Sequence, residues 1–150
     1  IVTALAPLPC KITWIDERAA QFPSVLPANV TVMTSDAPPD EVARASAGSY
    51  FIVLTHSHAL DEDICAKVLA RGDFAYLGLI GSATKRATFE RRLKVRGFDA
   101  VSVARITCPI GIAGIESKEP AAIAIAVVAE LLQVRELRSR VVTRPSSPHL

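Results

Sequence analysis

The sequence has little excess charge of either sign, few cysteines and no apolar run long enough to cross a membrane. Its 17 basic and 15 acidic residues leave a formal charge of +2, which is too small to indicate a nucleic-acid partner. The longest apolar stretch, residues 120–132, is shorter than the ~20 residues that a membrane-spanning helix needs. The start has no basic segment followed by a cleavage site, so we expect no signal peptide. A cytoplasmic domain is the simplest expectation.

The three cysteines, Cys10, Cys65 and Cys108, are an odd number and lie far apart in the sequence. This pattern fits a reducing compartment better than a disulfide framework. A zinc site would need three or four ligands, and Cys65 has no CxxC partner. We therefore predict neither a disulfide nor a metal site.

The length of 150 residues is within the range of one domain, and half of the residues are hydrophobic. The chain lacks an initiator methionine, and residues 1–6 are typical of the end of a helix, so we expect a part of a longer protein. We predict one domain over residues 1–138 and a disordered tail over residues 139–150.

Strand and helix patterns alternate along the chain. Gly72 and Gly97 are placed to end two of the helices. The alternation predicts right-handed βαβ units and a doubly wound, mostly parallel α/β sheet. We expect strands at residues 11–16, 30–34, 49–55 and 75–80, an extended stretch at 106–111, and helices that start near Pro38 and Asp61 and cover 83–96 and 118–137.

The first candidate site residue is Asp16, at the carboxyl end of the strand at 11–16. In dinucleotide-binding folds an acid at this place accepts hydrogen bonds from ribose hydroxyls. The glycine-rich turn that completes that fingerprint would lie about 20 residues earlier, before the start of the chain. An ordinary carboxylate at a strand end is the alternative.

Two histidines follow the strand at 49–55. Ligands of open α/β sheets bind at the carboxyl ends of strands, so His56 and His58 are well placed. In an extended backbone both would point to the same side, where a neutral imidazole can bond a heterocycle or a phosphate. A pair of polar loop residues bonded to the backbone is the alternative.

The strongest candidate site follows the strand at 75–80. Gly81 permits a tight turn, and Ser82 is placed to cap the helix at 83–96. Free N–H groups and the helix dipole favour an anion there, and Lys85 and Arg86 add positive charge. A plain cap with solvated cations is the alternative, although cations in the first turns oppose the helix dipole. We predict that a phosphate-bearing ligand binds here.

Two glycines, Gly111 and Gly114, lie among small apolar residues after Cys108 and Pro109. They allow a close approach of the backbone to a flat ligand. Cys108 has no visible general base and is expected to pack rather than react. The last helix is apolar on nearly all sides, which indicates burial against the sheet and against another subunit.

Three stretches together resemble the C-terminal domain of the XdhC/CoxI family of molybdenum hydroxylase accessory proteins. They are residues 53–61 (VLTHSHALD), residues 76–82 (YLGLIGS) with Lys85 and Arg86, and residues 109–112 (PIGI) leading to 117–124 (SKEPAAIA). The similarity runs from about Lys11 to Arg135. The resemblance implies a Rossmann-like, commonly homodimeric domain that binds the molybdenum cofactor, a pyranopterin bearing a phosphate, for delivery to a xanthine dehydrogenase-type partner.

Family members also have a glycine-rich strand–turn–helix that opens the Rossmann part, and it is absent here. Because that first strand is central in the doubly wound order, its absence predicts two sheet edges with unpaired backbone groups and a marginal fold. We expect a carrier rather than a turnover enzyme, because no residue is a clear catalyst. The alternative is an NAD(P)-dependent oxidoreductase. The predicted cofactor-binding residues are Gly81, Ser82, Lys85, Arg86, His56, His58, Gly111, Gly114 and Asp16.

Overall fold

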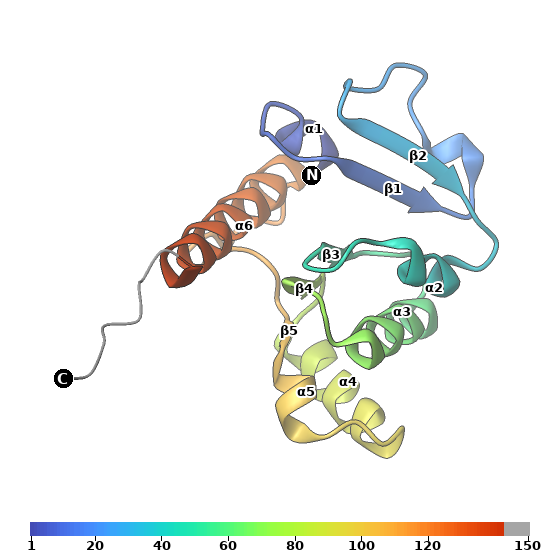
Figure 1. Ribbon diagram of the computed structural model, residues 1–150, viewed down its shortest axis with the longest axis vertical. Helices are drawn as coiled ribbons and strands as arrows, with labels where there is room; N and C mark the ends of the chain where they lie inside the picture. Colours follow the sequence, from blue (N-terminus) through green and yellow to red (C-terminus); the bar gives the residue numbers. More distant parts are fainter. Residues whose placement is uncertain (143–150) are drawn as a thin grey trace. The chain divides into compact units, whose positions relative to one another are not determined.

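The structure, a computed structural model, describes residues 1–142 (Figure 1). These residues divide into two compact units, which we call the sheet unit (residues 6–110) and the α6 unit (Gly111 onward), with the first five residues shared between them. The sequence predicts a single domain over 1–138. In chain order the elements are α1 (Val2–Leu5), β1 (Ile12–Asp16), the 3-10 helix η1 (Ala19–Gln21), β2 (Val30–Thr34), α2 (Pro38–Glu41), the 3-10 helix η2 (Val42–Arg44), β3 (Tyr50–Val53), α3 (His58–Arg71), β4 (Tyr76–Leu79), α4 (Ala83–Val95), α5 (Ala100–Ala104), β5 (Ile106–Thr107) and α6 (Pro120–Val142).

All strand pairs of the sheet unit are parallel. One sheet has the order β1-β2 and the other the order β3-β4-β5. Figure 1 shows the two sheets as separate sets of arrows. The predicted α/β, mostly parallel, Rossmann-like fold is confirmed. Within residues 1–142, β1 and β3 share no backbone hydrogen bond, so each has one unpaired edge, as expected for a doubly wound sheet that lacks its first strand.

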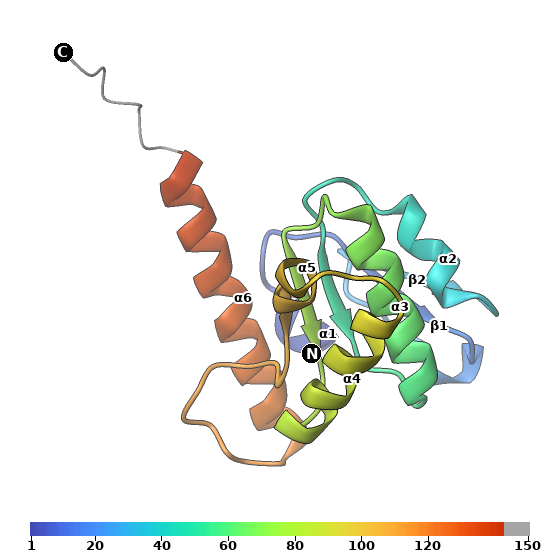
Figure 2. The same cartoon turned by 90° about the horizontal axis from the view of Figure 1, so that it is seen from below.

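The core of the sheet unit lies around β4, whose four residues are all buried. Leu77 and Leu79 of β4 are fully buried, as expected for a parallel strand covered on both faces. Phe89 and Leu93 of α4 pack into the same cluster. Figure 2 shows α3 and α4 side by side on one face of the second sheet. The core therefore fixes the start of both helices relative to the strands that precede them.

The apolar residues Leu60, Ile64 and Val68 are spaced to form one stripe along α3, but only Val68 is fully buried, and Leu60 and Ile64 are partly exposed. The face that packs inward carries Asp61 and Cys65, both with no exposed area, together with Val68 and Leu69. A carboxylate thus occupies a core position at the start of α3.

The helix ends follow the predicted signals. Gly72 ends α3 in the left-handed conformation, with φ of 72°. Gly97, with φ of 94°, follows the end of α4. The last helix runs to Val142, beyond the predicted end near residue 137, so residues 139–142 of the expected tail are helical. The rest of that tail lies outside the described residues. No helix within 1–142 is both long and apolar enough to cross a membrane.

Candidate functional site

The turn between β4 and α4 presents a row of backbone donors. Ser82 is the N-cap of α4, and its hydroxyl accepts a hydrogen bond from the N–H of Lys85, which confirms the predicted cap. The N–H groups from Gly81 to Thr84 donate no hydrogen bond within residues 1–142. Ser82, Ala83 and Thr84 are exposed. The start of α4 therefore offers accessible N–H groups at the positive end of the helix dipole, an arrangement that favours an anion.

Lys85, expected to add charge to this turn, is bound within the protein. Its Nζ lies 2.7 Å from Oδ2 of Asp61 and donates a second hydrogen bond, of 2.8 Å, to the carbonyl of Ile80. The ammonium also lies 5.4 Å from the centre of the Phe89 ring. The side chain of Lys85 passes over Gly81, where a Cβ atom would lie 2.5 Å from its Cδ. A side chain at 81 would therefore displace Lys85.

Arg86 is also bound within the protein. Its Nε lies 2.5 Å from Oε1 of Glu90, one turn along α4, and its guanidinium donates to the carbonyl of Val103. The Arg86 guanidinium lowers the pKa of the Glu90 carboxyl through this hydrogen bond. Both cations of the predicted phosphate site thus have carboxylate partners.

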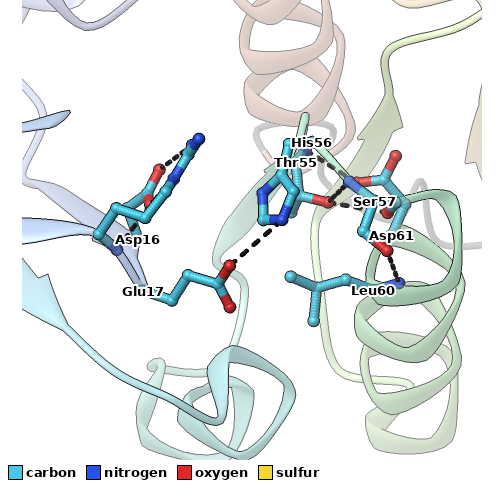
Figure 3. Close-up of polar contacts among 8 residues, drawn as sticks. Asp16, Glu17, Thr55, His56, Ser57, Leu60 and Asp61 are labelled. Atoms are coloured by element: carbon cyan, nitrogen blue, oxygen red, sulfur yellow. Dashed lines mark hydrogen bonds and ion pairs between the residues drawn. The ribbon is translucent and has the colours of Figure 1, made fainter.

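The loop after β3 is bound to the buried carboxylate of Asp61. Oδ1 of Asp61 accepts the N–H of Thr55 at 2.8 Å. The Thr55 hydroxyl donates to the carbonyl of Ser57 and accepts its N–H. Ser57 in turn is the N-cap of α3, because its hydroxyl accepts the N–H of Leu60. A chain of polar contacts therefore fixes the loop that carries His56 (Figure 3).

The side chain of His56 contacts Glu17, which follows β1 of the two-stranded sheet. Figure 3 shows the side chains of Glu17 and His56 directed toward each other, with 3.2 Å between Oε1 and Nε2. Asp16, the predicted ribose ligand, is at the end of β1, where both of its oxygens accept hydrogen bonds from the side chain of Arg18. The side chain of Arg18 lowers the pKa of the Asp16 carboxyl. The structure thus brings Asp16 and His56 to the same region at the carboxyl ends of β1 and β3.

The remaining predicted residues lie elsewhere. His58 is the first residue of α3 and is exposed. Gly111 and Gly114 belong to the α6 unit and have φ of 110° and 90°. The N–H of Gly111 donates to Glu130 at 2.6 Å, and a Cβ at Gly111 would lie 3.2 Å from the Cβ of Ala126. Gly111 is therefore needed for packing within the α6 unit.

Cys108 lies beside the α4 turn. Its Sγ is 3.8 Å from the carbonyl oxygen of Ser82, and burial raises the pKa of its thiol. It packs against the core cluster, as the sequence predicts for a cysteine before a proline. No group of three potential metal ligands lies together within residues 1–142.

Sequence reasoning missed two residues of this region, Glu17 and Asp61. Asp61 could have been found, because it shares a helical face with Cys65 and Val68 at intervals of four and seven residues. A carboxylate on a buried face requires a partner, and Lys85 is the partner. Glu17 carries no such signal, because its contact with His56 depends on how the strands are arranged.

The fold is a Rossmann-like α/β domain, a class in which ligands bind at the carboxyl ends of parallel strands, where the residues described above lie. The model of the XdhC Rossmann domain matches residues 1–131, and the chain belongs to this family. An uncharacterised protein of Escherichia coli K12, YqeB, is 28% identical over 132 residues, which are 87% of this chain and 24% of that protein. A crystal structure described as a xanthine dehydrogenase from Bacillus halodurans matches with a TM-score of 0.77 at 22% identity. The match covers 95% of this chain and 42% of that one.

Proposed function

We propose that this domain binds the molybdenum cofactor and holds it for a xanthine dehydrogenase-type hydroxylase, as an accessory protein rather than a turnover enzyme. The chain spans about a quarter of the curated relative and less than half of the similar structure, so the proposal concerns only the part of those proteins that it matches. Membership of the XdhC family and the name of the structural relative support a role alongside xanthine dehydrogenase.

The observation that carries the proposal is the row of accessible amides from Ser82 to Thr84. The cofactor is a pterin with a phosphate group, and backbone N–H groups at a helix start bind phosphate without a charged side chain. β3 is the strand beside β4, and α3 follows it. The start of α3 therefore adds a second helix N-terminus, with Ser57 as its cap. The donor set therefore fits a phosphorylated ligand at the carboxyl edge of β3 and β4.

A proline substitution tests the amide row directly. Ala83→Pro removes the N–H of the first helical residue, a position where proline is well tolerated because that N–H has no helical partner. Ser82 already has the extended backbone that precedes proline, with φ of −102° and ψ of 171°. We expect the dissociation constant for the molybdenum cofactor to rise about tenfold, which corresponds to a loss of about 1.4 kcal/mol in binding free energy.

The matched control is Ala100→Pro, at the same position of α5. Asp99 before it is also extended, with φ of −74° and ψ of 164°. Both variants should keep their stability within about 1 kcal/mol, and only Ala83→Pro should weaken binding. Failure of the unmodified protein to bind the cofactor would refute the proposed function, and unchanged affinity of Ala83→Pro would refute its placement at the α4 turn.

The alternative ligand is NAD(P), and its support is Asp16 at the carboxyl end of β1. The Asp16 carboxylate is bound by Arg18, so a ribose would have to displace that contact. Titration of the same protein with NADH, whose ribose has a free 2′-hydroxyl for a carboxylate to accept, separates the two proposals. Tight NADH binding that is lost in Asp16→Ala, with no binding of molybdenum cofactor, would favour the oxidoreductase.

We also propose that the protein acts as a homodimer. Ile125, Leu137 and Val141 of α6 are large apolar residues that are more than half exposed. Leu137 and Val141 lie one turn apart, and neighbouring exposed apolar side chains of this kind favour association with a partner. Light scattering of the purified protein tests the dimer, and a monomer at every concentration would contradict it.

A further inference from the structure

We propose that Asp61 and Lys85 form a positioning pair that fixes the loop after β3 against the turn before α4, and that Lys85 does not bind the phosphate itself. This inference rests on the function proposed above, and it assigns separate roles to the amides and to the cation at the same turn. The sequence pattern alone placed Lys85 among the direct phosphate ligands.

Asp61 is fully buried, and both of its carboxylate oxygens have partners. One oxygen accepts the N–H of Thr55 and the other is bound by Nζ of Lys85. A buried carboxylate without partners costs several kcal/mol. The pair therefore forms wherever α3 and α4 pack as they do here.

The ammonium of Lys85 is largely buried and already bound within the protein. Only 12% of its side chain is exposed, and two of its three ammonium protons are donated to Asp61 and to the carbonyl of Ile80. Because a carboxylate lies 2.7 Å from the ammonium, the pair carries no net charge. A neutral pair attracts an anion only weakly. Lys85 is thus poorly suited to bind phosphate, although it lies in the first turn of α4.

The Asp61–Lys85 pair connects the starts of two helices, α3 and α4. Through Thr55 it holds Ser57, the cap of α3, and through Ile80 it holds the residues that lead to Ser82, the cap of α4. Both helix starts are therefore fixed by one buried contact. This also accounts for a cation where the helix dipole disfavours one, because the partner of Lys85 is a carboxylate on another helix.

Two substitutions separate positioning from direct binding by the sign of their effect. Asp61→Asn removes a negative charge close to the phosphate site and frees the ammonium of Lys85. If Lys85 bound phosphate directly, Asp61→Asn would tighten cofactor binding or leave it unchanged. If the pair positions the two loops, Asp61→Asn and Lys85→Met should both raise the dissociation constant roughly tenfold, as is common for residues that orient ligand-binding groups.

The double variant Asp61→Asn/Lys85→Met should bind no more weakly than the worse single variant, because both substitutions break the same contact. Lys67→Met is the matched control. Lys67 lies on α3 and pairs with Asp40 on the surface, so this variant changes the net charge equally but should leave the affinity unchanged.

A measurement on the unmodified protein covers the case in which a variant fails to fold. In NMR spectra, binding of the cofactor should shift the amide signals of Ser82 and Ala83 and leave the ammonium signal of Lys85 in place. A larger shift at the Lys85 ammonium than at those amides, or tighter binding by Asp61→Asn, would overturn the inference while the proposed function stands.

Absence of cofactor binding by the unmodified protein would instead refute the function. In that case the ligand-free amide signals of Thr55 and Ser57 still report the pair, because they should move in Asp61→Asn and not in Lys67→Met.

Discussion

Glu17 and His56 lie 3.2 Å apart, although the strands that they follow share no backbone hydrogen bond within residues 1–142. Both side chains are more than a third exposed, and such pairs contribute at most about 1 kcal/mol. The contact therefore cannot replace a ladder of backbone hydrogen bonds between β1 and β3.

The open edges of β1 and β3 predict a pattern of amide exchange. The N–H of Ile12 donates to Asn29, and the carbonyl of Asp16 accepts from Ser35, so Ile12, Trp14 and Asp16 face β2. Because peptide groups alternate in direction along a strand, those of Thr13 and Ile15 face the open edge. In hydrogen exchange of the 150-residue chain, we expect Thr13 and Ile15 to exchange faster than Trp14.

The same reasoning applies to β3, where the carbonyl of Val53 accepts from Ile80. Phe51 therefore faces β4 as Val53 does, and the amide of Ile52, which faces the open edge, should exchange faster than that of Phe51. Equal protection of neighbouring residues along both strands would contradict the separation of the two sheets.

Gly78, in the middle of β4, has no room for a side chain. A Cβ atom there would lie 2.5 Å from Cδ1 of Ile110 and 2.6 Å from Cε1 of Tyr76. The Ile110 side chain is only partly buried, but Tyr76 is buried and stacks on Tyr50, so its ring has little room to move. Gly78→Ala should lower the free energy of unfolding by about 1–3 kcal/mol, the usual cost of overpacking a core. Chemical denaturation measures this, and a change below about 0.5 kcal/mol would show that the neighbours adjust freely.

Local signals in the sequence predicted the strands and the helix ends well. β2 was predicted at its observed residues, and Ser82 and Gly72 were recognised as a cap and a stop. These features depend on nearby residues: a hydroxyl bonds an N–H three residues ahead, and a glycine adopts a positive φ that other residues avoid. Such signals do not require knowledge of the rest of the fold.

The site depends on contacts between distant residues, and these the sequence did not reveal. Lys85 pairs with Asp61, which is 24 residues away, and His56 pairs with Glu17 on another sheet. The partner of Lys85 depends on the packing of α3 and α4, so the sequence left this cation free to face a ligand. Arg86 instead pairs with Glu90 four residues along its own helix, a spacing that was visible in the sequence.

The three cysteines should differ in reactivity. Cys10 is exposed, Cys108 is partly buried, and Cys65 is fully buried beside Asp61, where burial raises the pKa of its thiol to about 12. Because the thiolate is the reactive form, iodoacetamide should modify Cys10 first, Cys108 more slowly and Cys65 only after unfolding. Mass spectrometry of peptides measures the order, with the denatured protein as the control. Modification of Cys65 in the folded protein at the rate of Cys10 would contradict its burial.

Asp99 should make part of the stability depend on pH. It caps α5, and the hydrogen bond from the N–H of Ser102 lowers the pKa of its carboxyl below the ordinary value of 3.8. Because the pKa is lower in the folded state, the contribution of Asp99 is complete above the ordinary value and is lost as the pH falls through the lowered one. Asp99→Asn retains a capping oxygen, so it should match the unmodified protein near neutral pH and lose less stability in acid. Denaturation at several pH values tests this, together with NMR titration of the Asp99 carboxyl. A midpoint at or above the ordinary value would show that the cap does not hold the carboxylate.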